Sequence, residues 1–183
     1  RQTTKTTTPL PLYDQWTAEW YWWNACLYHG VLDGATGSFQ QVPVMVAQYQ
    51  VLDRRFVTHH SVPFVVGCIE FFVIQPLCLA LVWCIHGRRT AHRFPLELIT
   101  GCCHIFGLVL FLMAEVYEGQ VHVPSLDPVG TSPDNRWANV KVNFYHCMYY
   151  WFGFWFCNLI WLFIPSIRIY RAYAECVAQL QQE

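Results

Sequence analysis

The chain has 183 residues, which is enough for one domain, and 55% of them are hydrophobic against 13% that are charged. The apolar residues form long blocks rather than the short periods of a soluble core, which favours a membrane protein. With 11 basic and 12 acidic residues the formal net charge is −1, and so no basic field indicates a nucleic-acid partner.

Four apolar blocks predict an all-α fold, a multi-pass transmembrane helical bundle with four visible spans. Between the blocks lie polar, basic or Gly/Pro-rich connections. In chain order we expect a polar N-terminal tail (1–12), a first span (about Trp16–Phe39), a loop with a short re-entrant or interfacial helix (40–61), a second span kinked by Pro76 (Val62–His86), a basic hairpin (Gly87–Phe94), a third span (Pro95–Val116), a loop (Tyr117–Lys141), a fourth span (Phe144–Pro165) and a cytosolic C-terminal tail (172–183).

The fourth span carries the strongest signal. It is 22 residues long without Asp, Glu, Lys or Arg, enough helix at about 1.5 Å per residue to cross a hydrocarbon core of roughly 30 Å. We expect most of its aromatic rings to face lipid or to fill the bundle. Asn158 and Trp161 sit one turn apart and can share a helix face. Because lipid offers the Asn158 amide no partner, this span predicts a pocket for a large apolar molecule.

The basic residues predict the topology. The 87–94 hairpin and Arg168 with Arg171 of the C-terminal tail fall on one side of an alternating bundle, which the positive-inside rule places in the cytosol. The loops 40–61 and 117–141 then lie on the opposite side.

Each predicted span carries a polar group in the half of the membrane near those two loops. In span order, these groups are the pair His29 and Asp33, then Glu70, Glu115 and Asn158. Glu70, for example, lies eight residues from the start of its span, which is about 12 Å along a helix. Ionisable residues inside a membrane are costly and by default indicate a site.

The residue types indicate proton transfer. His29 and Asp33 are spaced i and i+4, so the carboxylate either orients the imidazole or forms an ion pair that only closes the bundle. Glu70 has no basic neighbour in its own helix, and desolvation should favour its neutral form, which can protonate an alkene or an epoxide. Trp161 is well placed to stabilise the resulting cation. Glu115 is either a site member or an interfacial residue.

The remaining histidines and the cysteines do not indicate a cofactor. The eight histidines have no metal-ligand spacing, and we interpret His59, His60, His104 and His146 as structural or interfacial. Eight of the nine cysteines lie in the predicted spans, where they resemble small buried hydrophobes. The sequence therefore predicts neither a metal nor another cofactor.

Three segments, VGCIEFFVIQPLCLALVWCIHGRRTAHRFPLELIT, GLVLFLMAEVYEG and YYWFGFWFCNLIWLFIP, resemble the emopamil-binding protein (EXPERA domain) family, which includes the sterol delta-8/delta-7 isomerases. With the weaker CLYHGVLDG, the resemblance covers roughly residues 20–170. It implies an EXPERA-like domain over 13–171, in the endoplasmic-reticulum membrane, with a pocket for a sterol-sized substrate. Family members have five spans, so the resemblance implies one span beyond the four visible here.

The resemblance also implies residue roles. His29 matches the family's active-site His, Glu70 its transmembrane carboxylate, Asn158 its amide and Trp161 its cation-facing indole. Asp33 stands where the sterol isomerases carry Glu, and is expected to complete the catalytic set. Val73, which stands in place of a Thr that helps to hold the carboxylate, is expected to bind substrate together with Trp161, Tyr150, Phe154 and Glu115.

Three functions remain open at this point. The first is a sterol isomerase that shifts a ring double bond through a carbocation. The second is a terpenoid or meroterpenoid cyclase, favoured by the Asp33 and Val73 departures and by the extra rings of Tyr149, Tyr150, Trp151 and Trp155. The third is a binder of lipids or amines without catalysis, like the sigma-2-receptor branch. The expected partners are a sterol or terpenoid and membrane lipid, with a homodimer as one candidate assembly.

Overall fold

The computed structural model describes residues 9–123, 137 and 140–181, and within these ranges every regular element is a helix. The prediction of an all-α multi-pass bundle is confirmed. Parts of the predicted tails and of the 117–141 loop lie outside the described residues. The elements are α1 (Leu12–Trp23), η1 (Asn24–Ser38), α2 (Pro43–Leu52), η2 (Arg54–Phe56), α3 (Ser61–Ile69), η3 (Glu70–Ile74), α4 (Gln75–His86), α5 (Thr90–Tyr117), α6 (Phe144–His146), η5 (Cys147–Phe156) and α7 (Cys157–Leu180).

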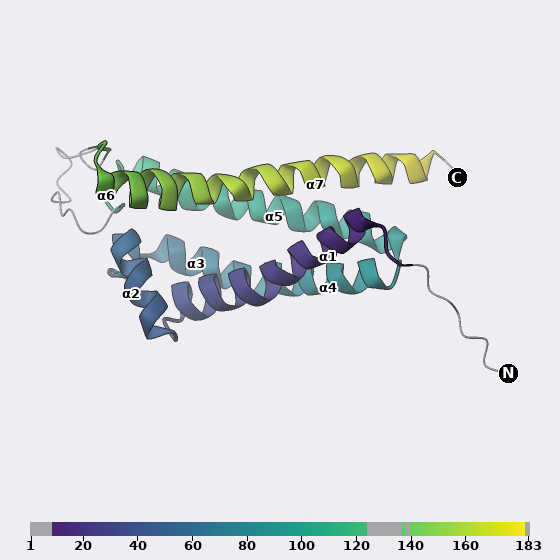
Figure 1. The fold of residues 1–183 in the computed structure, drawn as a ribbon, viewed down its shortest axis with the longest axis horizontal. Coiled ribbons are helices and arrows are strands. Elements are labelled where there is room, and N and C mark those ends of the chain that lie inside the picture. The colour runs from purple at the N-terminus through teal and green to yellow at the C-terminus, as the bar shows by residue number, and fades with distance from the viewer. Residues whose placement is uncertain (1–8, 124–136, 138–139, 182–183) are drawn as a thin grey trace.

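These elements join end to end into four long rods (Figure 1). The rods are α1 with η1, α3 with η3 and α4, α5 alone, and α6 with η5 and α7. The pair α5 and α7 forms one layer, and the α1–η1 rod packs along α3 and α4 in the other. Helix α2 lies across one end of the bundle, and the start of α1 and the end of α7 lie at the other end, as does the α4–α5 turn. The basic hairpin and the C-terminal helix are therefore at the same end, as the topology prediction requires.

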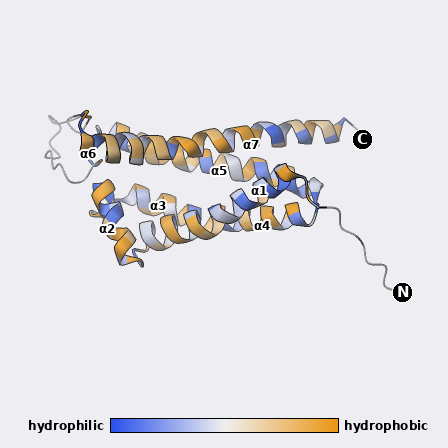
Figure 2. Cartoon of the chain, viewed as in Figure 1, coloured by the Kyte–Doolittle hydropathy of each residue, from blue (hydrophilic) through white to orange (hydrophobic). Residues whose placement is uncertain are grey.

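Three of the rods are long and apolar enough to cross a membrane: Ser61–His86, Thr90–Tyr117 and Phe144–Leu180. Hydrophobic residues cover much of their length (Figure 2). The predicted first span lies within α1 and η1, which together are long enough to cross a membrane. Their polar residues make them less hydrophobic than the three apolar rods of the described chain. A fourth span therefore stays a prediction.

Two helix boundaries differ from the predictions. Helix α5 begins at Thr90 and contains Pro95 near its start, so the basic hairpin is shorter than 87–94. Helix α7 continues through Pro165 to Leu180, although the proline cannot donate a backbone hydrogen bond. The extension packs against α1, because Arg168 is buried there and its Nη1 donates to the hydroxyls of Tyr13 and Thr17.

The three segments η1, η3 and η5 are π-helical, with backbone bonds that span five residues instead of four. The N–H of Phe39 donates to the Gly34 carbonyl, that of Gln75 to Glu70 and that of Cys157 to Phe152. The segment η3 ends at Ile74, two residues before Pro76, where a kink was expected. Such π turns are frequent at functional sites.

Close packing of η1 on α3 brings two of the predicted site residues to the same level. Gly67 of α3 makes the approach possible, because a Cβ at this position would lie 2.8 Å from the Asp33 carbonyl oxygen. Glu70 follows Gly67 by one turn, so Asp33 and Glu70 meet across this contact.

Candidate functional site

A cavity of about 250 Å³ lies inside the bundle, in the half near α2. Six predicted site residues line it: His29, Asp33, Glu70, Phe154, Asn158 and Trp161. The other lining residues are Tyr28, Leu32, Gly37, Tyr49, Leu52, Asp53, Phe56, Pro63, Val66, Gly67, His104, Gly107, Leu108, Phe111, Gly153 and Cys157. The cavity is thus built from all four rods and from α2, and most of its wall is apolar or aromatic.

Three ionisable side chains form one patch of this wall, and we call them the cavity trio: His29, Asp33 and Glu70. Nδ1 of His29 lies 3.2 Å from Oδ2 of Asp33. One ring nitrogen of His29 and one carboxylate oxygen each from Asp33 and Glu70 all lie within 4.8 Å of one another. His29 is buried, whereas Asp33 and Glu70 are half-buried at the cavity. His29 and Asp33 are therefore in direct contact for proton transfer, and Glu70 is close enough for transfer through one bridging water.

Aromatic rings form the wall beside the trio. The Trp161 ring centroid lies 6.2 Å from that of His29 and 4.9 Å from that of Tyr28. Trp20 packs against Trp161 at 5.2 Å and helps to fix the indole. A cation that forms near the trio would therefore meet a ring face within the range of cation–π attraction.

Asn158 lies on the same wall, one helical turn from Trp161. Its Nδ2 donates to the Phe154 carbonyl over 2.6 Å. This bond satisfies a backbone group at the end of the π-helical segment η5 and holds the side chain in one orientation. The side-chain oxygen remains as the acceptor that Asn158 can offer to a ligand.

His104, which the sequence analysis interpreted as structural or interfacial, lies on the cavity wall. Its Nε2 lies 2.8 Å from Nε2 of His29, and its ring stacks on Trp161 with a centroid distance of 6.1 Å. The two histidines are separated by 75 residues. No local spacing links them, and only an accurate packing of α5 against η1 would have revealed the pair.

Two residues expected to bind substrate do not line the cavity. Val73 is 46% exposed on the outside of the bundle. In an α-helix Val73 would lie near the face of Glu70, but the π-helical turn η3 turns it away. Tyr150 is only 2% exposed and packs with Leu108, Leu112 and Phe154 in a hydrophobic cluster beside the cavity.

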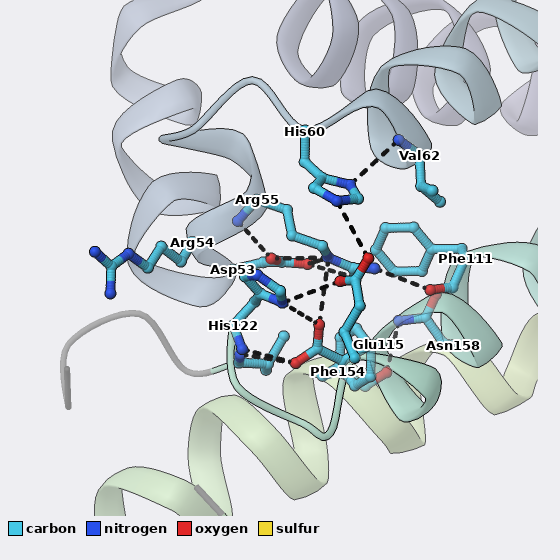
Figure 3. Close-up of polar contacts among 12 residues, drawn as sticks. Asp53, Arg54, Arg55, His60, Val62, Phe111, Glu115, His122, Phe154 and Asn158 are labelled. Carbon is cyan, nitrogen blue, oxygen red and sulfur yellow. Dashed lines mark hydrogen bonds and ion pairs between the residues drawn. The ribbon is translucent and has the colours of Figure 1, made fainter. Parts of the chain in front are cut away.

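Glu115 also lies away from the cavity wall, in a second polar group at the α2 end of the bundle (Figure 3). We call this group the Arg55 cluster: Asp53, Arg55, His60, Glu115, Glu118 and His122. Arg55 is fully buried and donates to both carboxylate oxygens of Asp53, and its Nε lies 3.7 Å from Oε2 of Glu115. Arg55 Nη1 also donates to the Phe111 carbonyl over 3.1 Å.

His122 completes the pairing of Glu115. Its backbone N–H and its Nδ1 each lie 2.8 Å from a carboxylate oxygen of Glu115. Burial opposes the charged imidazole, but the hydrogen bond to Glu115 and the charges of Glu115, Glu118 and Asp53 outweigh it and raise the pKa of His122. Each oxygen of Glu115 therefore has a protein partner, which supports an architectural role.

Two sets of side chains around the cavity have the composition of metal ligands. They are the cavity trio and the group of His29, Cys78 and His104, whose potential ligand atoms lie within 4.8 Å of one another. The predicted absence of a metal stays a prediction.

Comparison with known proteins identifies the family. The model of the EXPERA (EXPanded EBP superfamily) family matches residues 43–172. The chain is similar to the 3-beta-hydroxysteroid-Delta(8),Delta(7)-isomerase of Mus musculus, with 28% identity over 146 residues that cover 80% of this chain and 54% of that protein. The protein of the same name from Rattus norvegicus is 24% identical over 160 residues, covering 82% of this chain and 61% of that protein. The chain therefore spans between about half and three fifths of the length of these relatives.

Proposed function

Because the chain belongs to the EXPERA family, we propose that it is a membrane-embedded isomerase that shifts a ring double bond in a sterol. Two relatives carry the name of such an isomerase, and the membrane setting fits the three apolar rods. We propose the endoplasmic-reticulum membrane as its location, with the α4–α5 turn facing the cytosol. The observation that carries the proposal is the cavity trio, in which two carboxyl groups and an imidazole lie within 4.8 Å in a largely apolar cavity.

The trio can supply the proton and take one back. Glu70, as a carboxylic acid, gives its proton to one alkene carbon, and the π electrons form the new C–H bond and leave a cation on the other carbon. Asp33 then removes a proton from a neighbouring carbon, whose C–H electrons form the shifted double bond. Transfer of this proton from Asp33 to Glu70 restores both groups. No net charge is gained and no co-reactant is consumed.

The surroundings of the trio suit the cationic intermediate. None of the cavity-lining residues in the described part of the chain is Lys or Arg, so no fixed cation repels the intermediate. Trp161 offers its ring face, and Asn158 offers an amide oxygen to the substrate. Preorganised groups of this kind stabilise a transition state without the cost of rearrangement.

The terpenoid cyclase alternative now has less support. Val73, Tyr150, Tyr149, Trp151 and Trp155 were reasons to consider it, and none of them lines the cavity. Asp33 alone remains, because it lies on the cavity and is one methylene shorter than the family's Glu. On a sterol, Asp33→Glu should preserve or raise turnover, whereas a cavity reshaped for a terpenoid should lose about a hundredfold when the longer acid intrudes.

The test supplies microsomes that contain the protein with a delta-8 sterol or an epoxy-prenyl substrate in heavy water. We expect the sterol to be converted to its delta-7 isomer with one deuterium incorporated, and the Asp33→Asn variant to convert it far more slowly. Cyclised product from the epoxide would identify a cyclase instead. Tight sterol binding without conversion of either substrate would indicate a non-catalytic binder and overturn the proposal.

A further inference from the structure

Four glycines line the cavity, and packing accounts for three of them. A Cβ at Gly67 would lie 2.8 Å from a backbone oxygen of η1. One at Gly153 would lie 3.1 Å from Cδ1 of Leu52. One at Gly37 would lie 3.3 Å from the Leu32 carbonyl oxygen. These distances are shorter than ordinary van der Waals contact, so a side chain at any of the three positions would force the bundle to shift.

The fourth glycine, Gly107, has room for a side chain. It lies inside α5, and a Cβ there would be 3.8 Å from Cγ1 of Val66 and 4.0 Å from Oε1 of Glu70. Both are ordinary contacts, and beyond the adjacent stretch of α5 no other described atom comes within 4 Å. Glycine inside a helix is less favourable than alanine. The chain therefore loses helix stability at Gly107 without a gain in packing, and the space that remains is a part of the cavity beside Glu70.

Two ring-bearing side chains flank this space along α5. His104 precedes Gly107 by three residues and Phe111 follows it by four, so the three positions share one face of the helix, and all three line the cavity. We call the gap between the two side chains the Gly107 notch. Val66 and Glu70 of the neighbouring rod lie across from it. The notch is thus a place where α5 leaves room for a ligand directly against the proposed acid.

The distance from the notch to Glu70 suits proton transfer. A carbon in the place of the missing Cβ would lie 4.0 Å from Oε1 of Glu70, and reacting atoms need to approach to about 3–3.5 Å. A substrate ring in the notch reaches this separation by a small shift towards the acid. His29 and Asp33 lie on the same patch of the wall as Glu70, so the ring would also face the proposed base.

We propose that Gly107 is a specificity-determining residue: the notch receives the part of the sterol ring system that carries the double bond and holds it against Glu70. This proposal rests on the proposed function and places the substrate within the same site. A fused ring system is rigid and cannot bend around an added methyl group. Gly107→Ala would fill the notch and hold the double bond away from the acid, although the protein itself has room for the methyl.

The test compares the stability and the activity of Gly107→Ala with those of the wild type in lipid nanodiscs. The thermal midpoint of unfolding should rise by about 2–4 °C, since alanine is the better helix former and displaces no protein atom. The kcat/KM for the delta-8 sterol should fall about 10- to 200-fold, the usual effect of one carbon in an apolar site. A loss of less than about tenfold would overturn the proposal. A midpoint below that of the wild type would also overturn it, because packing would then require the glycine.

Gly101 supplies the matched control on the same helix. A Cβ there would lie 2.6 Å from Cγ1 of Ile169 in α7, and Gly101 does not line the cavity. Gly101→Ala should therefore show the opposite pattern, a lower thermal midpoint with a kcat/KM of the folded protein near that of the wild type. A loss of kcat/KM as large as that of Gly107→Ala would mean that any alanine in α5 disturbs the site, and would overturn the proposal.

Binding of a labelled delta-8 sterol separates this proposal from the proposed function. If the wild type binds the sterol without converting it, the proposed function fails. In that case a weaker affinity of Gly107→Ala for the sterol supports the notch as its binding place, and equal affinities of the two proteins overturn it. A wild type that binds no sterol would overturn both.

Discussion

The cavity trio and the Arg55 cluster are both groups of acids and imidazoles inside the bundle, yet their partners differ. In the Arg55 cluster a buried guanidinium and His122 neutralise Asp53 and Glu115. In the trio, Asp33 pairs with the His29 imidazole, and among the described residues neither Asp33 nor Glu70 pairs with a Lys or Arg. Intramembrane position alone is therefore a poor guide to a reactive acid. An acid such as Glu115, whose oxygens are all occupied by cationic side chains and backbone N–H groups, fits a structural role, whereas one that faces an apolar cavity can exchange its proton.

The largest effect that this comparison predicts is on catalysis, at Glu70. Glu70→Gln keeps the size of the side chain but cannot donate the proton, so turnover of the delta-8 sterol should fall by about 10²–10⁴-fold. The thermal midpoint of unfolding in detergent should stay near that of the wild type. Activity within about tenfold of wild type would remove Glu70 as the acid. Glu115→Gln, from the other group, should lower stability instead.

The second prediction concerns Arg55, on which the other cluster depends. Arg55→Met leaves Asp53 and Glu115 buried without their cation, which should cost about 3–5 kcal/mol of unfolding free energy. Arg54→Met is the matched control, because the neighbouring guanidinium points away from the cluster (Figure 3). Chemical unfolding in detergent gives both values. If the two variants were equally stable, the pairing in the Arg55 cluster would not be what holds the α2 end together.

A smaller effect is expected at the aromatic wall of the cavity. Trp161→Leu should weaken binding of a hydrophobic tertiary amine, which carries the charge of the intermediate, about 5- to 30-fold more than binding of a neutral sterol. Competition against a labelled sterol measures both affinities. Equal losses for the two ligands would mean that Trp161 contributes packing alone.

The smallest predicted effect is the pH dependence that the Arg55 cluster gives to stability. The folded-state pKa of His122 is raised above its ordinary value of about 6.5, so its contribution is complete below that pH and is lost as pH rises through the folded-state pKa. The thermal midpoint of the wild type should therefore approach that of His122→Gln as pH rises from 6 to 9, roughly the range around that value. A gap between the two proteins that widens with pH would contradict this assignment.

Much of the fold could be predicted, because a helix that crosses lipid must be long and apolar. Residues such as Glu70 and Asn158 stand out in apolar runs, and His29 with Asp33 has a recognisable spacing. These residues do meet at one cavity, while their roles stay a prediction. Tertiary pairing was harder to predict. Glu115 pairs with Arg55, which lies 60 positions earlier, in the connection between the first and second predicted spans. This connection has no apolar periodicity from which the pairing could be predicted.

The positions of Val73 and His104 differ from what the sequence led us to expect, for related causes. Val73 was expected at the cavity because it stands where the family carries a Thr, but π-helical hydrogen bonding changes the face on which it lies, and this bonding leaves no mark in composition. His104 lies within an apolar run like many structural histidines, and only the packing of α5 against η1 and α7 brings it to His29 and Trp161.

The π-helical segments η1, η3 and η5 also bear on how this chain should be aligned with its relatives. A π turn holds one residue more than the α turn that it replaces, and it is naturally read as a single-residue insertion within a helix. Where relatives have an α turn at the same place, the true gap falls inside a span and not in a loop. An alignment that keeps all gaps in loops would shift residues such as Val73 by one position against their counterparts. Gaps permitted at Asn24–Ser38, Glu70–Ile74 and Cys147–Phe156 should restore the register of the residues that face the cavity.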